Sequence, residues 1–519
     1  MTSPTTFPLM TNSWQIAAGT IAALTAVWLL GQTIVSRRAK RSFPPGPPGL
    51  PLVGNLLDMP NVTEWLVYAE WAKKYGDIVG VRMPGMSIVF LDDEQDVKAL
   101  FASRSSNYSN RLSMPMLHLS GWEDATASTS IGNLFRTHRR LMTKFLGSQT
   151  IKKTAGIQEE FTRAAIIDMI QKDDSVQSHL KWMAAKLLLR LTYGHNVVDR
   201  DDGFVHWADV SLQSFLLTSR PDWIVNSLPF LQYLPAWLPG MGFKEIAADS
   251  RMKAQRSHDD PLKWVKAQIA AGTAQPSFAL DVLSDMDLAV DEDPIRVVLG
   301  NLYIAGSDTI IATLSWFLLA MSLFPDAQRR AQAEIDEVIA GERLPHLADR
   351  PNLPYLDALL KEIVRWNAVT NIALPHVALA DDTYKGFRFE KGTIFMPNVW
   401  SILHNPKKYP DPFKFKPERF LDKSNERSVD GVEVNEDPNH FVFGFGMRIC
   451  PGRHLADSVI WTFAAQILAS CNISSARYAD GTAITESNID STSGFVSCPL
   501  PFTSKIVARS RHAQALLFD

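Results

Sequence analysis

The chain has 519 residues, of which 46% are hydrophobic and 21% charged, ordinary values for a globular protein that exclude intrinsic disorder. A formal net charge of -3 argues against a nucleic-acid partner. The three cysteines, Cys450, Cys471 and Cys498, form no CxxC pair, which argues against a disulfide framework, a structural zinc site and a four-cysteine iron-sulfur cluster.

The N-terminal region predicts a membrane anchor. Residues 14–35 carry no charge, and 22 residues of helix span about 33 Å, close to the hydrocarbon thickness of a bilayer. A cationic cluster follows at 37–41, which by the positive-inside rule keeps the rest of the chain on the cytosolic side. A cleaved signal peptide is the less favoured alternative, because the apolar run is long and the cluster follows it.

The chain therefore divides into four predicted parts. Residues 44–51 are rich in proline, which fixes φ and removes backbone donors, so they should form a stiff, extended connector. The expected parts are a short lumenal segment (1–13), a transmembrane helix (14–35), a basic stop with a proline-rich hinge (36–51) and a single folded domain (52–519).

The first part of the folded domain predicts a β-hairpin, a loop and a basic helix. Ile78–Val81 and Ser87–Leu91 have strand character and flank a Met-Pro-Gly turn. Residues 103–130 lack a clear period, so we expect a loop with one short helix, and long loops in compact enzymes often bind ligands. Leu134–Leu146 predicts a helix whose basic side chains are typical of a solvated face.

A long helix at Ile295–Phe324 is expected to run through the body of the protein. Acidic residues and a proline precede it, Pro325 follows it, and its 30 residues span about 45 Å. Ala-Gly-Ser-Asp-Thr at 305–309 interrupts its apolar sequence, although glycine costs about 1 kcal/mol relative to alanine and buried polar groups need partners. A functional site is favoured here over a kink in which Ser and Thr bond back to the helix.

The C-terminal third predicts further helices and short strands. Asp357–Trp366 should be a helix with Glu362 and Arg365 on one face, where they could form an ordinary surface pair. The other expected elements are strands at Tyr384–Phe389 and Thr393–Pro397, a proline-rich coil from His404 onward and an apolar helix at Arg453–Ser470.

The segment 443–452 reads Phe-Gly-Phe-Gly-Met-Arg-Ile-Cys-Pro-Gly. Cys450 thus lies in a glycine-rich loop, with an arginine two positions before it and a glycine two positions after it. Such surroundings favour a metal-ligating thiolate, whereas a lone cysteine is otherwise often a buried thiol that packs as a small hydrophobe. Cys471 and Cys498 are interpreted as ordinary thiols.

Taken together, these features resemble a cytochrome P-450, a haem-thiolate monooxygenase, over nearly the whole chain. The cysteine loop matches the family pattern Phe-x-x-Gly-x-Arg-x-Cys-x-Gly through Phe443, Gly446, Arg448, Cys450 and Gly452. Three more motifs match in the expected order, namely residues 305–309, Glu362 with Arg365, and 417–420 with Arg419. The resemblance implies an α+β fold, mainly α with small β-sheets, in which a triangular prism of helices surrounds a buried haem, preceded by one transmembrane helix.

The resemblance also assigns roles to residues. It implies haem b with Cys450 as the axial ligand of the iron, because thiolate ligation favours cleavage of the oxygen-oxygen bond. Asp308 and Thr309 would be the acid and the alcohol that organise water and deliver protons. The remaining roles are partners of the haem propionates (Arg448, Arg139 and His376) and a structural triad (Glu362, Arg365 and Arg419).

Two positions depart from the family pattern. Many relatives have tryptophan four positions before the propionate arginine, whereas this chain has Phe135, which cannot donate a hydrogen bond. Ile310 stands where many relatives have a second threonine, a common variation that should leave the core chemistry unchanged.

Electrons are expected to come from a partner protein. Gly444 and Gly446 lack the third glycine that a dinucleotide loop requires. In eukaryotic membrane-bound members of the family the donor is NADPH-cytochrome reductase, and cytochrome b5 is a second candidate. The acidic surface of the reductase would meet Arg136, Arg140, Lys144 and Arg453. The same resemblance implies the endoplasmic reticulum membrane, with the catalytic domain facing the cytosol.

The expected substrates are dioxygen and a lipophilic small molecule. The resemblance points to apolar segments at 105–125, 210–245, 301–309, 369–374 and 493–496 as substrate contacts. The sequence is most similar to basidiomycete members that modify secondary metabolites, so a terpenoid is the first hypothesis and an aromatic or indole-type metabolite the second. Two rival classes are a haem-thiolate isomerase or dehydratase, disfavoured by Asp308 and Thr309, and a non-enzymatic haem-binding membrane protein.

Overall fold

The computed structural model describes residues 42–285, 290–421, 427–429 and 432–518. The predicted lumenal segment, the transmembrane helix and the basic cluster at 37–41 lie outside the described residues, so the division of the chain into four parts remains a prediction. Within the proline-rich hinge, the carbonyl of Pro45 accepts a hydrogen bond from the amide of Gly80 (2.9 Å). This part of the hinge therefore packs against the first strand.

The described residues are mainly helical, as expected. The α-helices are α2 (Glu64–Tyr75), α3 (Glu94–Val97), α4 (Ser105–Tyr108), α5 (Pro115–Leu119), α6 (Asn133–Leu146), α7 (Ser148–Lys153), α8 (Ala155–Gln171), α9 (Val176–Tyr193), α10 (Gly203–Thr218), α11 (Ile224–Ser227), α12 (Phe243–Ala270), α13 (Phe278–Leu283), α14 (Glu292–Leu323), α15 (Pro325–Ile339), α16 (Pro354–Trp366), α17 (Val399–Leu403), α18 (Asn439–Val442), α19 (Arg453–Ser470) and α20 (Arg511–Phe518). Shorter helical turns are η1 (Leu56–Asp58), η2 (Lys98–Ser103), η3 (Pro229–Tyr233), η4 (Leu347–Asn352), η5 (Pro417–Phe420) and η7 (Gly446–Arg448).

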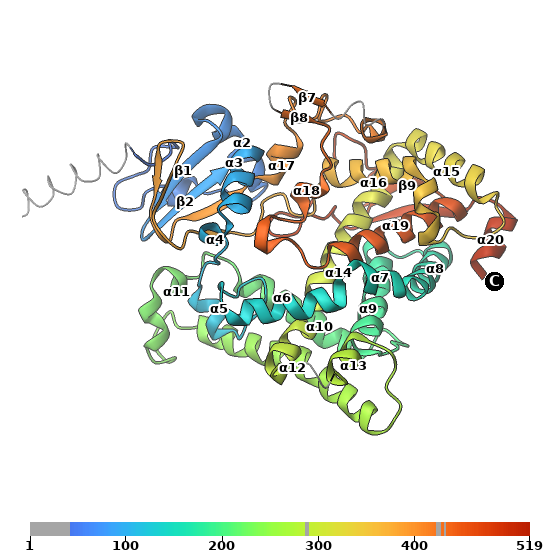
Figure 1. The fold of residues 1–519 in the computed structure, drawn as a ribbon, viewed down its shortest axis with the longest axis horizontal. Helices are drawn as coiled ribbons and strands as arrows, with labels where there is room; N and C mark the ends of the chain where they lie inside the picture. Colours follow the sequence, from blue (N-terminus) through green and yellow to red (C-terminus); the bar gives the residue numbers. More distant parts are fainter. Residues whose placement is uncertain (1–41, 286–289, 422–426, 430–431, 519) are drawn as a thin grey trace, which may run out of the picture.

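The strands form small sheets. They are β1 (Ile78–Met83), β2 (Met86–Leu91), β3 (His376–Val377), β4 (Asp382–Tyr384), β5 (Phe387–Phe389), β6 (Ile394–Pro397), β7 (Arg427–Val429), β8 (Val432–Val434), β9 (Cys471–Tyr478) and β10 (Phe502–Ala508). One four-stranded sheet has the order β1-β2-β6-β3, in which β1 and β2 form the predicted antiparallel hairpin and β2 and β6 run parallel. In Figure 1 this sheet lies at the end of the molecule opposite α20, and helices fill the space between them.

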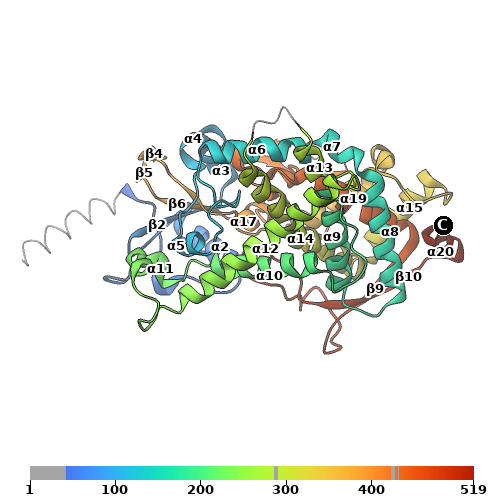
Figure 2. The ribbon, with the colours of Figure 1, turned by 90° about the horizontal axis from the view of Figure 1, so that it is seen from below.

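Helix α14 crosses the interior, where it packs against α6, α9, α12, α16 and α19. Figure 2 shows it near the centre of the molecule. It begins three residues earlier than predicted. The backbone of Asp291 is extended, so the helix begins directly after it, and the carboxylates of Glu292 and Asp293 are stabilised by the positive end of the helix dipole. Among the described residues it alone is long and apolar enough to span a bilayer, but 72% of its most apolar window is buried, as in a core helix.

Two segments differ from the prediction. Residues 103–130 contain two short helices, α4 and α5, instead of one. The predicted strand Tyr384–Phe389 is a hairpin of β4 and β5, because Lys385 and Gly386 have φ values of 48° and 80° and so form a tight turn. The other predicted helices, at Leu134–Leu146, Asp357–Trp366 and Arg453–Ser470, are confirmed as α6, α16 and α19.

Candidate functional site

The loop that carries Cys450 is closed by its own backbone. The amide of Cys450 donates to the carbonyl of Phe443 (2.7 Å), which joins the two ends of the loop. Gly446 has a φ of 54°, and a Cβ there would lie 2.0 Å from the carbonyl oxygen of Phe101. Only glycine fits this position, where the loop contacts η2.

Cys450 is half-buried, and hydrogen-bond donors lie close to its thiol. Burial raises its pKa, while backbone amides of Gly452 and Arg453 and the charge of Arg139 oppose that rise by stabilising a thiolate. A Cβ on Gly452 would lie 3.8 Å from the sulfur, so the chain passes close beside it. These donors can moderate the charge of a ligating thiolate. Burial raises the pKa values of Cys471 and Cys498 to about 11, as expected for ordinary thiols.

A group of buried cations lies beside this loop. Arg448 donates to the carbonyls of Ser109 (2.8 Å) and Thr129 (2.6 Å). Arg111, which the sequence analysis missed, donates to the carbonyls of Leu374 (3.0 Å) and Pro375 (2.7 Å). Within the described part of the chain neither arginine has a carboxylate partner.

Electrostatics in this group favour an added negative charge. Burial and the charge of Arg448 lower the pKa of Arg111 to about 9. Burial and the charge of Arg111 lower the pKa of His376 to about 3, and its Nδ1 donates to the carbonyl of Tyr108 (2.6 Å). An anion bound here would relieve the repulsion among these groups.

Helix α6 places two predicted residues beside the cysteine loop. Arg139 donates to the carbonyl of Ile449 (2.7 Å), one residue before Cys450. The guanidinium of Arg448 lies 4.0 Å from the centroid of the Phe135 ring. Phe135 thus contacts a predicted propionate partner through its ring face, although it has no hydrogen-bond donor.

Helix α14 contributes the predicted acid and alcohol. Ala305 is exposed and Thr309 half-buried, although every residue from Ile310 to Met321 is buried. The hydroxyl of Thr309 donates to the carbonyl of Ala305 (3.0 Å). A threonine therefore does bond back to the helix, as in the structural alternative to a functional site at residues 305–309. A Cβ on Gly306 would lie 3.2 Å from Leu188, so glycine lets α14 pack closely on α9.

Asp308 lies next to Thr309 in a charged environment. Burial raises its pKa, the nearby Lys181 lowers it and Asp209 raises it. Lys181 and Asp209 themselves form an ion pair (2.8 Å) between α9 and α10. The carboxyl group therefore binds a proton more readily than an ordinary surface aspartate does.

Together these residues fit a haem. A haem needs one protein ligand, cationic partners for its two propionates, and free surface on the face opposite the ligand. Cys450 can supply the ligand, the buried arginines can supply the cationic partners, and the exposed Ala305 leaves free surface on α14. Helix α14 packs on both α6 and α19. No cluster of three or more metal-ligating side chains occurs among the described residues, and a haem iron held by one thiolate requires none.

The predicted structural triad is formed, and it is buried. Arg365 donates to both carboxylate oxygens of Glu362 (2.7 and 2.9 Å), and Arg419 approaches the same carboxylate (3.1 Å). Arg365 also donates to the carbonyl of Leu403, and Arg419 donates to that of Pro410. The first interpretation of Glu362 and Arg365 as a surface pair is wrong, because both side chains have no exposed area.

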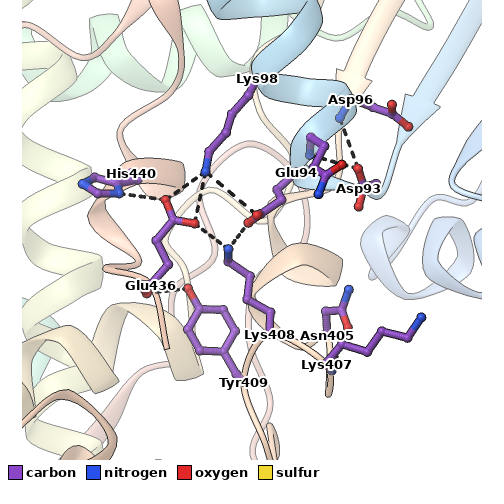
Figure 3. Close-up of polar contacts among 11 residues, drawn as sticks. Asp93, Glu94, Asp96, Lys98, Asn405, Lys407, Lys408, Tyr409, Glu436 and His440 are labelled. Atoms are coloured by element: carbon purple, nitrogen blue, oxygen red, sulfur yellow. Dashed lines mark hydrogen bonds and ion pairs between the residues drawn. The ribbon is translucent and has the colours of Figure 1, made fainter. Parts of the chain in front are cut away.

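A second buried ion-pair network brings together Glu94, Lys408 and Glu436 (Figure 3). Lys408 is 1% exposed and pairs with Glu94 and with Glu436 (2.5 Å), and Lys98 also contacts Glu436 (3.0 Å). Lys98 and Lys408 both lie over the ring of Phe441, 5.5 and 4.9 Å from its centroid. The network connects α3 and η2 to α18, which precedes the cysteine loop.

The proposed docking residues lie on α6 and at the start of α19. Arg136, Arg140 and Lys144 are exposed on α6, and Lys144 pairs with Asp285. Arg453 is half-buried and donates to the carbonyl of Cys450 (3.4 Å). The basic side chains are therefore on the elements that surround the cysteine loop.

The predicted substrate segments also meet. Leu117, Trp122, Leu212 and Ile304 belong to one buried apolar cluster, which joins segments 105–125, 210–245 and 301–309. The amide of Ser497, the residue directly after segment 493–496, donates to the carbonyl of Val369 (2.7 Å), so this segment ends beside segment 369–374.

Comparison with known proteins gives a consistent result. The family model described as Cytochrome P450 matches residues 44–504. The chain is 38% identical over 500 residues to Cytochrome P450 monooxygenase 208 of Postia placenta, and the match covers 96% of each of the two chains. It is 35% identical over 514 residues to Cytochrome P450 monooxygenase claR of Ampulloclitocybe clavipes, covering 98% of this chain and 93% of the relative. It is 34% identical over 500 residues to Cytochrome P450 monooxygenase ple1 of Rhodocybe pseudopiperita, covering 95% and 94%.

Proposed function

The chain belongs to the cytochrome P450 family and is a haem-thiolate monooxygenase, and from this premise we propose that it oxidises a terpenoid scaffold in fungal secondary metabolism. One oxygen atom from dioxygen would enter the substrate. Support for a lipophilic substrate comes from the apolar cluster around Leu117, Trp122, Leu212 and Ile304. Support for a fungal pathway comes from the basidiomycete relatives.

Cys450 is proposed as the axial ligand of haem b. When bound, a thiolate-ligated haem supplies dioxygen activation. The amides of Gly452 and Arg453 would donate to the ligating sulfur, and Phe443 and Gly446 would hold the loop in its closed form. This arrangement around one sulfur is the observation that carries the proposal.

The propionates are proposed to bind the buried cations. Arg448, Arg139 and His376 are the partners expected from the sequence, and Arg111 joins them because it is buried beside Arg448 without a carboxylate. The Nδ1 of His376 already donates to Tyr108, so donation to a propionate would require a second proton on Nε2, which the anion would favour and which burial and the charge of Arg111 oppose.

Asp308 and Thr309 are proposed to move protons. Because burial raises the pKa of Asp308, its carboxyl group can hold a proton and pass it on. The hydroxyl of Thr309 donates to Ala305 and keeps its lone pairs free to accept a hydrogen bond from water. The retained acid and alcohol favour a monooxygenase over an isomerase.

Electrons would come from a reductase partner, specifically NADPH-cytochrome reductase, with cytochrome b5 as a second donor. The basic residues Arg136, Arg140, Lys144 and Arg453 would meet its acidic surface. Residues 14–35 would anchor the chain in the endoplasmic reticulum membrane with the catalytic domain facing the cytosol.

The experiment is turnover with isotopically labelled dioxygen. The full chain, co-expressed with the reductase and supplied with NADPH, is offered a panel of terpenoids and a panel of indoles. We expect a terpenoid product that carries one labelled oxygen atom. Labelled products from indoles alone would overturn the substrate class, and products without the label would overturn the reaction.

A further inference from the structure

An ion pair between helices α9 and α10 lies beside the helix that carries Asp308. Nζ of Lys181 on α9 is 2.8 Å from Oδ2 of Asp209 on α10. The side chain of Lys181 is 48% exposed and that of Asp209 is 19% exposed, so solvent reaches the pair. Both helices pack against α14 (Figure 2). The pair therefore connects solvent with the helix of the proposed acid.

Tyr303 of α14 binds the other oxygen of the same carboxylate. Its side chain is 2% exposed, and its hydroxyl donates to Oδ1 of Asp209 (3.4 Å). Ser307, one turn further along α14, forms a hydrogen bond with this hydroxyl and belongs to the motif at 305–309. Polar groups thus extend from the exposed lysine to the motif, and the carboxylate of Asp209 is held from both sides.

The charges of this pair reach Asp308. After burial, which raises the pKa of Asp308, the largest effects come from Lys181, which lowers it, and Asp209, which raises it. Gly306 lies two residues before Asp308, and a Cβ there would be 3.2 Å from Leu188 of α9. This close approach of the two helices explains why a charge on α9 acts on a carboxyl group of α14.

Two further titratable groups, Tyr303 and Cys498, lie near Asp308 and carry no charge at neutral pH. Cys498 comes from the segment before β10. Burial is the main cause that raises the pKa of Tyr303 above its ordinary value and that of Cys498 to about 11, and the charge of Asp308 contributes to both. Among the described residues, the charges that act on Asp308 therefore come from Lys181 and Asp209.

We propose that Lys181 and Asp209 are positioning residues that control the protonation of Asp308. The inference rests on the proposed role of Asp308 as the acid of the monooxygenase. In that role Asp308 gives up a proton in each turnover and must regain one from solvent. The negative charge of Asp209 favours uptake of the proton, and the positive charge of Lys181 favours its release. The two opposed charges keep the acid able to do both.

The test is an infrared pH titration of the holoenzyme, which follows the absorption band of the protonated carboxyl group without requiring turnover. The band of Asp308 is identified by its absence from Asp308→Asn. Lys181→Met removes the charge that lowers the pKa of Asp308, so the midpoint should rise by about one pH unit. Asp209→Asn removes the charge that raises this pKa, so the midpoint should fall by about the same amount. Lys181→Arg keeps the charge and should keep the wild-type midpoint.

Lys186→Met is the matched control, because Lys186 lies on the same helix but over the ring of Trp182 (4.8 Å from its centroid), and it should leave the midpoint unchanged. The proposal is overturned if Lys181→Met and Asp209→Asn move the midpoint in the same direction, or if neither moves it. The carbonyl spectrum of the reduced protein is recorded on every sample. A normal spectrum without opposite shifts overturns this inference alone, whereas loss of the thiolate band in the wild type overturns the proposed function as well.

Discussion

Buried arginines without carboxylate partners are the clearest sign of a bound anion at the scale of single residues. Arg111 and Arg448 are bonded to backbone carbonyls, and burial lowers the pKa of each. Proteins seldom bury a cation without a counter-charge, because desolvation of the charge is expensive. Phe135 supports Arg448 through its ring face, so the departure from tryptophan preserves one contact in this group.

Arg111→Leu should therefore loosen the haem. A hydrogen bond to a charged group contributes about 1.5–3 kcal/mol, so we expect the haem to dissociate about ten- to a hundredfold faster. Transfer of haem to apomyoglobin measures this rate without requiring turnover. Arg104→Leu, which removes a half-buried ion pair with Asp382, is the control and should leave the rate unchanged. Equal rates for the two variants would show that Arg111 does not contact the propionates.

Thr309→Ala should uncouple turnover. Without the hydroxyl, water near Asp308 loses an organising partner, and reducing equivalents should go to peroxide instead of product. We expect the ratio of product formed to NADPH consumed to fall severalfold, with peroxide rising to match. Thr313→Ala, one turn further along α14, removes a similar back-bonded hydroxyl and should keep the ratio. Unchanged coupling in Thr309→Ala would remove this residue from the proton pathway.

At the scale of elements, the Lys408 network joins three separate stretches of the chain, of which α3 and η2 together form one. Its members come from α3, η2, the coil after α17 and the segment before α18. Hydrogen bonds from Lys408 and His440 outweigh the effect of burial and lower the pKa of Glu436 to about 2. Glu436 is thus ionised at neutral pH, and its charge requires the two lysines.

Lys408→Met should destabilise the protein strongly, because it leaves two buried carboxylates without a buried cation. We expect the free energy of unfolding to fall by about 3–5 kcal/mol, as is typical when one partner of a buried pair is removed. Urea unfolding followed by circular dichroism measures the change. Lys73→Met breaks an exposed pair with Glu70 and should change stability by less than about 1 kcal/mol. A loss equally small for Lys408→Met would mean that the network contributes little.

The elements that the sequence predicts well are those whose pattern is local. The period of α6, α16 and α19 and the turn between β1 and β2 can be recognised within a few residues. The hairpin of β4 and β5 was missed although its Lys-Gly turn is also a local signal. The Lys408 network could not be predicted, because Glu94 and Lys98 lie more than 300 residues along the chain from their partners Lys408 and Glu436, and neither lysine belongs to a motif.

The same contrast holds for the site. Cys450, Glu362 and Arg365 belong to spaced motifs and could be identified from the sequence alone. Arg111 lies in a segment without period, and its contacts with Leu374 and Pro375 arise only when the chain folds.

At the scale of the whole molecule, the basic residues of α6 are the surface on which we propose that the reductase docks. Arg140→Glu and Lys144→Glu together should slow the first electron transfer about tenfold at low ionic strength and flatten its dependence on salt. Stopped-flow reduction under carbon monoxide measures both quantities. Lys73→Glu, an exposed lysine on α2, is the control and should behave as the wild type. An unaltered salt dependence in the double variant would exclude this surface from docking.

The central claim, that Cys450 ligates a haem iron through its thiolate, is tested most directly by the absorption spectrum of the reduced, carbonyl-bound protein. We predict that the wild type has the red-shifted band from which the family takes its name, and that Cys450→Ala lacks it. Cys498→Ala, which removes an ordinary thiol, should retain the band. Absence of the band from the wild type, or its persistence in Cys450→Ala, would contradict the assignment of the axial ligand.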